Sequence, residues 1–217
     1  MIVIAGAGGS LGPYVTRRLA EAGEHLALVD YDAARLEGLP GEHHAVDLLD
    51  DAATRAWASG LDDVTGVVHL VGGWRGGTPL SEAPLEDWTR LHDLLIRTVQ
   101  HTTRAFAPAL KAAGERGRFV LVSAKQAQSP TSTNAAYAAA KAAAEAWTLA
   151  YADELAETRG TANILVVNAI VTDEMRAANP DKAYKTFADA RHMADAIALL
   201  LSDSAGAMNG QRLSLHG

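Results

Sequence analysis

Tyr137 and Lys141 are two side chains that together could move a proton. They lie four residues apart in a run of alanines, which are strong helix formers, so a helix is predicted here. A spacing of four places both side chains on one face of that helix. A phenol has a pKa of about 10, and a nearby ammonium lowers the pKa, which suits acid/base chemistry on an alcohol or ketone. The same spacing also arises by chance, so a surface pair without function is the alternative.

A glycine cluster near the start of the chain is the second candidate site. It follows a short apolar run at 2–5 and opens an amphipathic segment at 11–22. In a strand–glycine–helix arrangement, backbone N–H groups and the helix N-terminus can hold a pyrophosphate. A glycine turn without a ligand is the alternative. The cofactor contacts predicted in this loop are Gly6, Gly8, Gly9, Ser10, Leu11 and Gly12.

Asp30 follows the second apolar run, at 26–29, and indicates which dinucleotide would bind. A carboxylate at this position accepts hydrogen bonds from the adenosine ribose and repels a 2′-phosphate. The glycine cluster contains no basic residue that would bind such a phosphate. These features favour NAD over NADP. Asp30 could instead cap the next helix, although Asp32 can fill that role.

The whole chain alternates between apolar runs and helical patterns. Strands are predicted at 2–5, 26–29, 44–46, 64–71, 119–122, 163–169 and 212–215. Helices are predicted at 11–22, 33–36, 51–59, 85–113, 134–158 and 191–201. Continuous apolar strands between helices indicate an α/β fold with a parallel sheet covered on both faces. We expect one domain over residues 1–217, without internal repeats.

Composition excludes several classes of function. The net charge of -7 argues against a surface for nucleic acid or anionic membrane. The absence of cysteine excludes disulfides and thiolate metal sites, and His43 and His44 have no second ligand pair, so no metal is expected. The first apolar run has no basic residues before it and breaks at Gly6, so it is interpreted as a strand rather than a signal peptide. No segment is predicted to span a membrane, and a cytoplasmic location is expected.

The order of these motifs resembles the short-chain dehydrogenase/reductase family over essentially the whole chain. Residues 5–12 match the family's T-G-x-x-x-G-x-G loop, with Ala5 for threonine and Ser10 for the middle glycine. Tyr137 and Lys141 match its Y-x-x-x-K motif, and residues 210–217 are similar to its closing strand. The resemblance implies a single-domain Rossmann fold, a doubly wound parallel sheet of about seven strands in the order 3-2-1-4-5-6-7.

The resemblance also implies roles for particular residues. Tyr137 would exchange a proton with the substrate oxygen, while Lys141 would hold the nicotinamide ribose and lower the pKa of the tyrosine. Residues 69–72 stand where the family has N-N-A-G, and Thr172 matches the threonine that contacts the carboxamide. The further cofactor contacts implied are Asp47, Leu48, Val71, Gly72 and Gly73.

Two catalytic positions and one loop depart from the family pattern. Ala124 stands at the usual serine and Leu95 at the usual asparagine, and the Pro-Gly segment after the sixth strand is missing. Ser123 is the candidate third catalytic residue, but neighbouring strand residues point to opposite faces, so it substitutes only if the backbone shifts. Hydroxyls in the loop at 129–133 are alternatives.

The leading function is an oxidoreductase that transfers a hydride between NAD(H) and a small alcohol or ketone. The alternatives are a non-catalytic nucleotide-binding or regulatory homologue, and a non-redox enzyme, a cyclase or isomerase, that reuses the pocket. Trp74 and Arg75 could contact an aromatic or anionic substrate, or belong to a surface turn. The family's interface helices correspond to 85–113 and 134–158, so a homodimer or homotetramer is expected, with no nucleic-acid or membrane partner.

Overall fold

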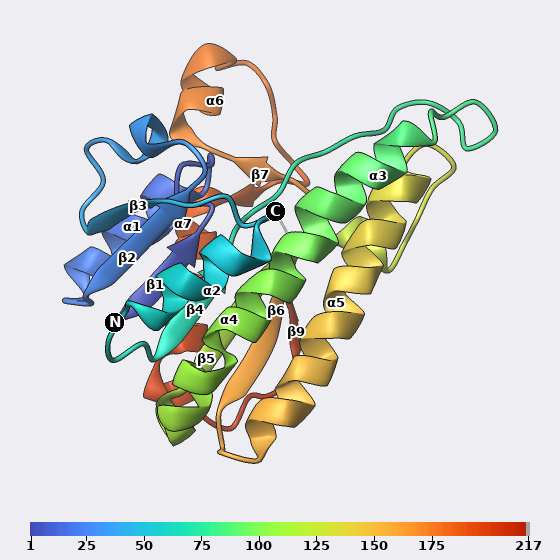
Figure 1. Ribbon diagram of the computed structural model, residues 1–217. Coiled ribbons are helices and arrows are strands. Elements are labelled where there is room, and N and C mark those ends of the chain that lie inside the picture. Colours follow the sequence, from blue (N-terminus) through green and yellow to red (C-terminus); the bar gives the residue numbers. More distant parts are fainter. Residues whose placement is uncertain (216–217) are drawn as a thin grey trace.

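Seven parallel strands form a central sheet in the computed structural model, which describes residues 1–215 (Figure 1). The order is β3-β2-β1-β4-β5-β6-β9, which confirms the predicted order, with β9 as the seventh strand. The strands are β1 (Ile2–Ala5), β2 (Leu26–Asp30), β3 (Glu42–Ala45), β4 (Gly66–His69), β5 (Arg118–Ala124), β6 (Thr161–Val167) and β9 (Arg212–Ser214). The parallel arrangement brings the carboxyl ends of all these strands to one edge of the sheet.

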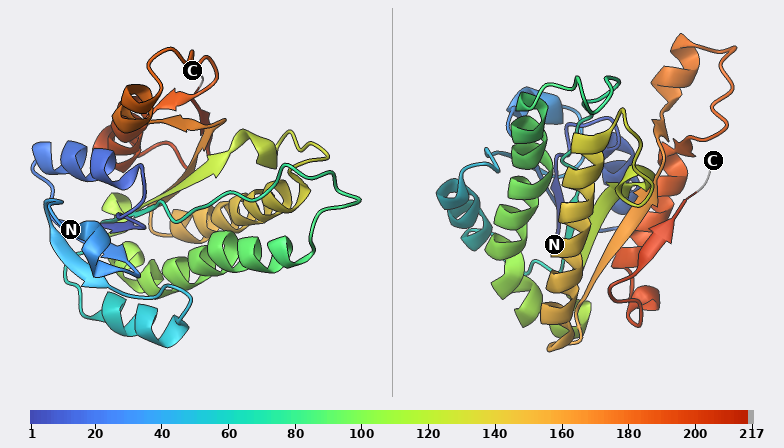
Figure 2. Two further views of the ribbon diagram at one scale, coloured as in Figure 1. Left: turned by 90° about the horizontal axis from the view of Figure 1, so that it is seen from above. Right: turned by 90° about the vertical axis from the view of Figure 1, so that its right-hand side faces the viewer.

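Helices cover both faces of the sheet, as Figure 2 shows in two further views. On one face lie α1 (Gly12–Glu21) and α7 (Ala190–Leu201), which share an apolar core with alternate residues of β1 and β5. On the other face lie α4 (Thr98–Ala112) and α5 (Ala135–Ala156), with α2 (Asp51–Ser59) packed against α4. Strands buried on both faces are uniformly apolar, which explains the continuous runs in the sequence.

The alternation along β5 decides which side chains face α5. Val120 and Val122 pack with the core on the α1 and α7 side, whereas Phe119 and Leu121 pack with the core on the α4 and α5 side. Successive strand side chains point to opposite faces. Ser123 therefore faces α5.

The helix predicted at 85–113 contains a break in regularity. It begins as α3 (Glu86–His92), passes through a π-helical turn at Asp93–Arg97 and continues as α4. π-helical turns are rare overall, but those that do occur often lie at functional sites. Leu95 is buried within this turn.

Several predicted boundaries were wrong, and some short elements were missed. The segment Ala33–Leu36 is a 3-10 turn, β4 is shorter than the predicted strand at 64–71, and β6 begins two residues before the predicted strand at 163–169. Between β6 and α7 the chain forms a small parallel sheet, β7 (Ile170–Val171) with β8 (Ala188–Asp189), and a helix, α6 (Asp173–Ala178). These pieces are too short for hydrophobic periodicity to reveal. Within residues 1–215, every helix is too short or too polar to cross a lipid bilayer.

Candidate active site

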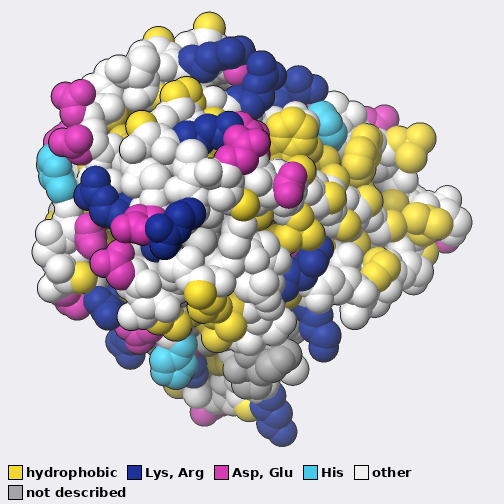
Figure 3. Space-filling model, turned by 90° about the horizontal axis from the view of Figure 1, so that it is seen from below, with side chains coloured by type: hydrophobic (Ala, Val, Ile, Leu, Met, Phe, Trp, Pro, Cys, Tyr) yellow, Lys and Arg dark blue, Asp and Glu magenta, His cyan; other side chains and the backbone are white. Residues whose placement is uncertain are grey.

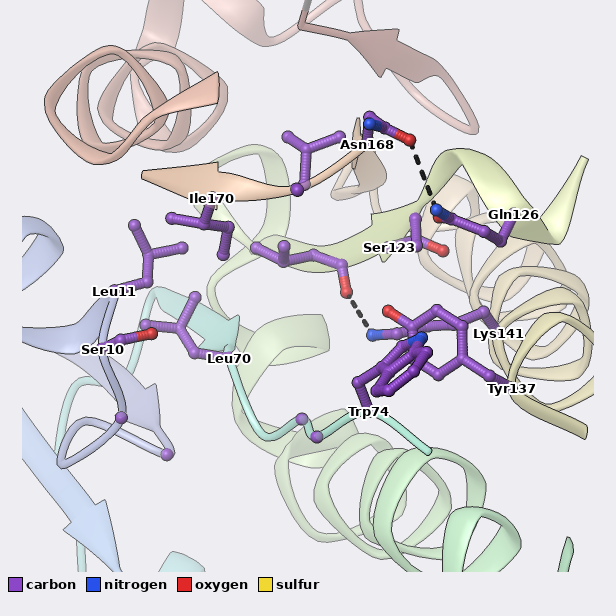
Figure 4. A pocket seen from close by; sticks show the side chains of 18 of the residues that line it. Ser10, Leu11, Leu70, Trp74, Ser123, Gln126, Tyr137, Lys141, Asn168 and Ile170 are labelled. Atoms are coloured by element: carbon purple, nitrogen blue, oxygen red, sulfur yellow. Dashed lines mark hydrogen bonds between the residues drawn. The ribbon is translucent and has the colours of Figure 1, made fainter. Parts of the chain in front are cut away.

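A cavity of about 570 Å³ opens at the carboxyl ends of the strands. Open α/β sheets bind ligands at this edge. The cavity brings the glycine loop at residues 6–12 together with Tyr137 and Lys141 at the start of α5 (Figure 4). Other residues that line it include Trp74, Ser123, Ala124, Gln126, Asn168 and Phe187.

Lys141 is held in place at the cavity wall. Its Nζ donates a hydrogen bond of 2.9 Å to the carbonyl oxygen of Val122, at the end of β5. The side chain is buried, and Figure 4 shows Lys141 and Tyr137 together on the wall of the cavity. The two residues therefore face the cavity rather than lying as a pair on an exposed helix face.

Burial sets the protonation states of this pair. Burial raises the pKa of Tyr137 to about 12 and lowers the pKa of Lys141 to about 8, the latter opposed by the negative charge of Glu145. The family resemblance implied that Lys141 lowers the pKa of Tyr137, whereas in this structure burial raises that pKa. Loss of water around the phenol disfavours its charged form. Tyr137 is thus a proton donor at neutral pH.

His69 occupies the position of the first asparagine in the family's N-N-A-G segment. It is fully buried, and its Nε2 lies 3.2 Å from Thr98 Oγ1. Because that hydroxyl donates to the carbonyl of Leu94 at 2.7 Å, His69 Nε2 carries the proton. Burial, with a smaller contribution from Lys141, lowers the pKa of His69 to about 3. The imidazole of His69 is therefore neutral at neutral pH.

The Ser123 side chain lines the cavity, but its hydroxyl is engaged with another side chain. Its Oγ donates to Glu145 Oε1 at 2.7 Å, and Glu145, which is 2% exposed, also accepts from Arg212 Nε at 2.6 Å. The neighbouring Ala124 lines the cavity at the family's serine position without offering a donor. The catalytic role predicted for Ser123 is therefore not supported by the direction of its hydroxyl.

A second cavity of about 350 Å³ adjoins the first and shares Gly6, Gly9, Leu70 and Gly72 with it. An elongated space with a glycine loop at its middle suits a dinucleotide, with the adenosine half on one side and the nicotinamide half on the other. The predicted contacts that line the second cavity are Asp30, Asp47, Leu48 and Val71.

Gly6 and Gly12 of the glycine loop have no room for a side chain. Gly6 adopts φ +79°, and a Cβ on Gly12 would lie 1.8 Å from the carbonyl oxygen of Ala7. The N–H groups of Gly12, Tyr14 and Val15 in the first turn of α1 donate to backbone carbonyls. Within residues 1–215, the N–H groups of Ser10 and Leu11 have no such partner and can meet an anion. The residues present thus fit a pyrophosphate.

Arg35 lines the second cavity and was not predicted from the sequence. Its Nη1 lies 3.3 Å from Asp30 Oδ1. The other Asp30 oxygen accepts from the Gly8 N–H at 3.2 Å. The 3-10 turn at Ala33–Leu36 brings the guanidinium back to the carboxylate, a contact that inspection of the glycine loop alone does not reveal.

The remaining predicted contacts divide into two groups. Two of them lie off both cavities: Gly8 packs against Asp30, and Thr172 caps α6 by accepting from the Met175 N–H at 3.3 Å. The predicted residues that line the first cavity are Gly6, Gly9, Ser10, Leu11, Gly12, Gly72, Gly73, Ser123, Tyr137 and Lys141. Sequence reasoning named neither Gln126 nor Asn168, which lie opposite the glycine loop.

Known proteins share this architecture and these motifs. A family model described as short chain dehydrogenase matches residues 1–183. L-xylulose reductase of Homo sapiens is 29% identical over 234 residues, covering 100% of this chain and 94% of that protein. A gluconate 5-dehydrogenase from Burkholderia cenocepacia, solved with NADP and tartrate, is 25% identical with a TM-score of 0.85, covering 100% of this chain and 93% of its own.

A short-chain oxidoreductase from Pseudomonas aeruginosa PAO1, described as containing an atypical catalytic center, shares the fold. Its TM-score is 0.88 at 21% identity, with 100% of this chain and 95% of that chain covered. With the family model matching most of its length, this chain belongs to the short-chain dehydrogenase family of oxidoreductases.

Proposed function

We propose that the protein transfers a hydride between NAD(H) and a small alcohol or ketone. The observation that carries this proposal is the cavity that the glycine loop shares with Tyr137 and Lys141. The names of the relatives, a reductase and a dehydrogenase, support redox chemistry of this kind. The bound cofactor would supply the hydride, and the chain would supply the proton and the positioning.

Each part of the chain has one task in this proposal. Tyr137 donates its proton to the substrate oxygen during reduction, and Lys141 holds the ribose hydroxyls next to the nicotinamide. The loop at residues 6–12 and the N-terminus of α1 hold the pyrophosphate. Asp30 accepts hydrogen bonds from the adenosine ribose, which favours NAD, while Arg35 beside it makes NADP the second candidate.

One observation favours a binding protein without turnover as the second candidate. Ala124 and Leu95 stand where the family has its serine and asparagine, and the Ser123 hydroxyl is already engaged with Glu145. Loss of one oriented donor typically lowers turnover by about 10²–10³-fold. A slow enzyme and a nucleotide-binding homologue can therefore be separated by a sensitive assay.

The test compares two tyrosines of the same helix. Tyr137→Phe removes the proposed proton donor, whereas Tyr151→Phe removes a hydroxyl in the core between α5 and β5. Oxidation of NADH is followed with a panel of small ketones and aldehydes, and NADH affinity is measured by fluorescence titration. We expect Tyr137→Phe to abolish reduction at unchanged NADH affinity, and Tyr151→Phe to keep both. Equal turnover in Tyr137→Phe would rule out the mechanism, and tight NADH binding without turnover by the wild type would favour the binding protein.

A homodimer or homotetramer in the cytoplasm completes the proposal. Apolar side chains lie exposed at the start of α3 and on α5, with Leu85 85%, Trp88 41% and Trp147 37% exposed. Figure 3 shows hydrophobic side chains gathered on the side of the molecule where α3 and α5 lie. Contiguous apolar surface of this kind is typical of interfaces.

A further inference from the structure

The polar side chains on the cavity wall opposite the glycine loop hydrogen-bond to other protein groups. Gln126 Nε2 donates to Asn168 Oδ1 at 3.3 Å, which Figure 4 marks with a dashed line, and Asn168 Nδ2 donates to Thr186 Oγ1 at 3.2 Å. Gln126 Oε1 has no partner within residues 1–215, but it is shielded from solvent and so from a ligand. Ser123 is bonded to Glu145. The hydrogen bonds of this wall therefore run within the protein.

The Tyr137 hydroxyl, in contrast, is open to a ligand. Within residues 1–215 it has no hydrogen-bond partner, and unlike Gln126 Oε1 it is not shielded from solvent. Lys141 is the charged residue among those that line the cavity in the described chain, and the proposed function commits it to the cofactor. A carbonyl can thus bond to Tyr137, whereas a charged substituent finds neither a carboxylate nor a second cation among these side chains.

Trp74 is held at the cavity with most of its side chain uncovered. It lines the cavity and is 61% exposed, whereas its neighbour Arg75 lines neither of the two cavities. The Gly77 N–H donates to the Thr133 carbonyl at 2.8 Å, which ties this loop to the segment before α5. A Cβ on Gly76 would lie 3.0 Å from Trp74 Cζ2, so the indole packs closely on this glycine. The loop therefore presents an aromatic surface to the cavity, and not the arginine.

Phe187 is a second aromatic side chain on the cavity, and it comes from the segment after α6. It is half-buried, and its ring meets that of Tyr184 edge to face, with 5.1 Å between the centroids. The Tyr184 hydroxyl donates to the carbonyl of Met175 at 2.7 Å, which anchors the two rings to α6. Binding cavities commonly combine aromatic walls with a few polar groups that orient the ligand. Here the aromatic walls are Trp74 and Phe187, and the open polar group is Tyr137.

We infer that the substrate is an uncharged aryl ketone or aryl aldehyde, or the corresponding alcohol, whose ring packs against Trp74. This inference rests on the proposed function. In reduction, the hydride of NADH forms the new C–H bond at the carbonyl carbon, and the proton of Tyr137 joins the carbonyl oxygen. The products are the aryl alcohol and NAD⁺. The ring is unchanged and contributes binding through its contact with the indole. Trp74 is thereby a specificity-determining residue.

The kinetic test uses acetophenone and acetone, two methyl ketones of which only the first carries a ring. We expect the wild type to prefer acetophenone by at least about 100-fold in kcat/KM, since even one methylene group in an apolar pocket changes this parameter about 10–200-fold. Trp74→Ala should lower the preference at least about tenfold, and Trp74→Phe should retain most of it because an aromatic face remains. The intrinsic reactivities of the two ketones cancel when the ratios are compared. The matched control is Arg75→Ala in the same loop, whose ratio should equal the wild-type ratio.

An equal preference in the wild type and Trp74→Ala would overturn the inference. The same holds if Trp74→Ala changes the oligomeric state in size-exclusion chromatography and leaves the preference intact, because a second copy of the chain would then cover the indole. A binding measurement separates this inference from the proposed function. Saturation-transfer NMR with NAD⁺ present follows the ring protons of 1-phenylethanol. Ring transfer that Trp74→Ala abolishes would support the inference even without turnover. Ring transfer that is absent from the wild type, or unchanged in Trp74→Ala, would overturn it.

Discussion

The hydroxyl of Ser123 donates a hydrogen bond of 2.7 Å to the buried carboxylate of Glu145, one turn of α5 beyond Lys141. The carbonyl of Val122, the preceding residue of β5, accepts from Lys141 Nζ at 2.9 Å. Two consecutive strand residues thus hold two consecutive turns of the helix that carries Tyr137. Arg212 of β9 completes the arrangement by donating to the second Glu145 oxygen at 2.6 Å. The role of Ser123 in this arrangement is to support α5.

Ser123→Ala should therefore reduce stability more than activity. The buried Glu145 carboxylate loses a donor, which lowers the free energy of unfolding by about 1–3 kcal/mol. Urea denaturation measures this loss, and steady-state kinetics should show kcat within about tenfold of wild type, well short of the loss of a catalytic donor. A fall of about 10²-fold in kcat at unchanged stability would instead show that the Ser123 hydroxyl contacts the reacting atoms.

Ala124→Ser restores a hydroxyl at the family's serine position. Ala124 lines the cavity and is 4% exposed, so the added oxygen would face the substrate space rather than bulk water. We expect kcat for ketone reduction to rise about tenfold, part of the about 10²–10³-fold that an oriented donor contributes. Ser123→Ala in the same background should leave that gain intact. An unchanged kcat in Ala124→Ser would show that the site works without a donor at this position.

The rate of ketone reduction should fall at alkaline pH. Burial lowers the pKa of Lys141 to about 8, so its ammonium is charged below that pH and neutral above it. The pKa of Tyr137, raised by burial to about 12, keeps the phenol protonated across this range. His69, with its pKa lowered by burial to about 3, stays neutral and adds no acidic limb near neutrality. The pH profile should be flat below about pH 8 and decline above it.

Two substitutions assign that decline to Lys141. Lys141→Arg carries a charge at all accessible pH values, so the decline should move to higher pH even if the rate is lower. Glu145→Gln removes the charge that opposes the effect of burial on the pKa of Lys141, so the decline should move to lower pH. A decline that neither substitution moves would belong to another group.

Local rules explain what the sequence could predict. The glycine loop, the apolar strands and the spacing of Tyr137 and Lys141 follow from neighbours in the chain, and strand alternation already cast doubt on Ser123. The contact between Gln126 and Asn168 joins residues 42 positions apart, and the contact of Asn168 with Thr186 depends on a loop with no periodic pattern. Such contacts exist only after the sheet has brought β5 and β6 together. The predicted direction of the pKa shift of Tyr137 was wrong for a related reason, because the burial that raises this pKa is a property of the fold.

Asp30→Asn should shift cofactor preference toward NADP. The substitution keeps a side-chain oxygen that can accept from the Gly8 N–H. It removes the negative charge that repels a 2′-phosphate and pairs with Arg35. The ratio of NADPH to NADH affinity should rise about tenfold, equivalent to about 1.4 kcal/mol. Fluorescence titration with both cofactors measures it. Adding Arg35→Ala should remove the gain, and an unchanged ratio in Asp30→Asn would place the selecting contact elsewhere.

Substitutions at two glycines of the same loop should affect different properties, protein stability in one case and cofactor affinity in the other. A Cβ on Gly12 would lie 1.8 Å from a backbone oxygen, that of Ala7, so Gly12→Ala forces the backbone apart and should destabilise the protein by more than about 3 kcal/mol. A Cβ on Gly9 would lie 3.2 Å from its nearest neighbour, the carbonyl oxygen of Gly6, so a small shift accommodates the methyl group. Gly9 lines both cavities, however, so Gly9→Ala should weaken NADH binding about tenfold or more at nearly unchanged stability. Thermal unfolding and NADH titration of both variants check the contrast. Intact NADH binding in a stable Gly9→Ala protein would show that the pyrophosphate does not lie on this loop.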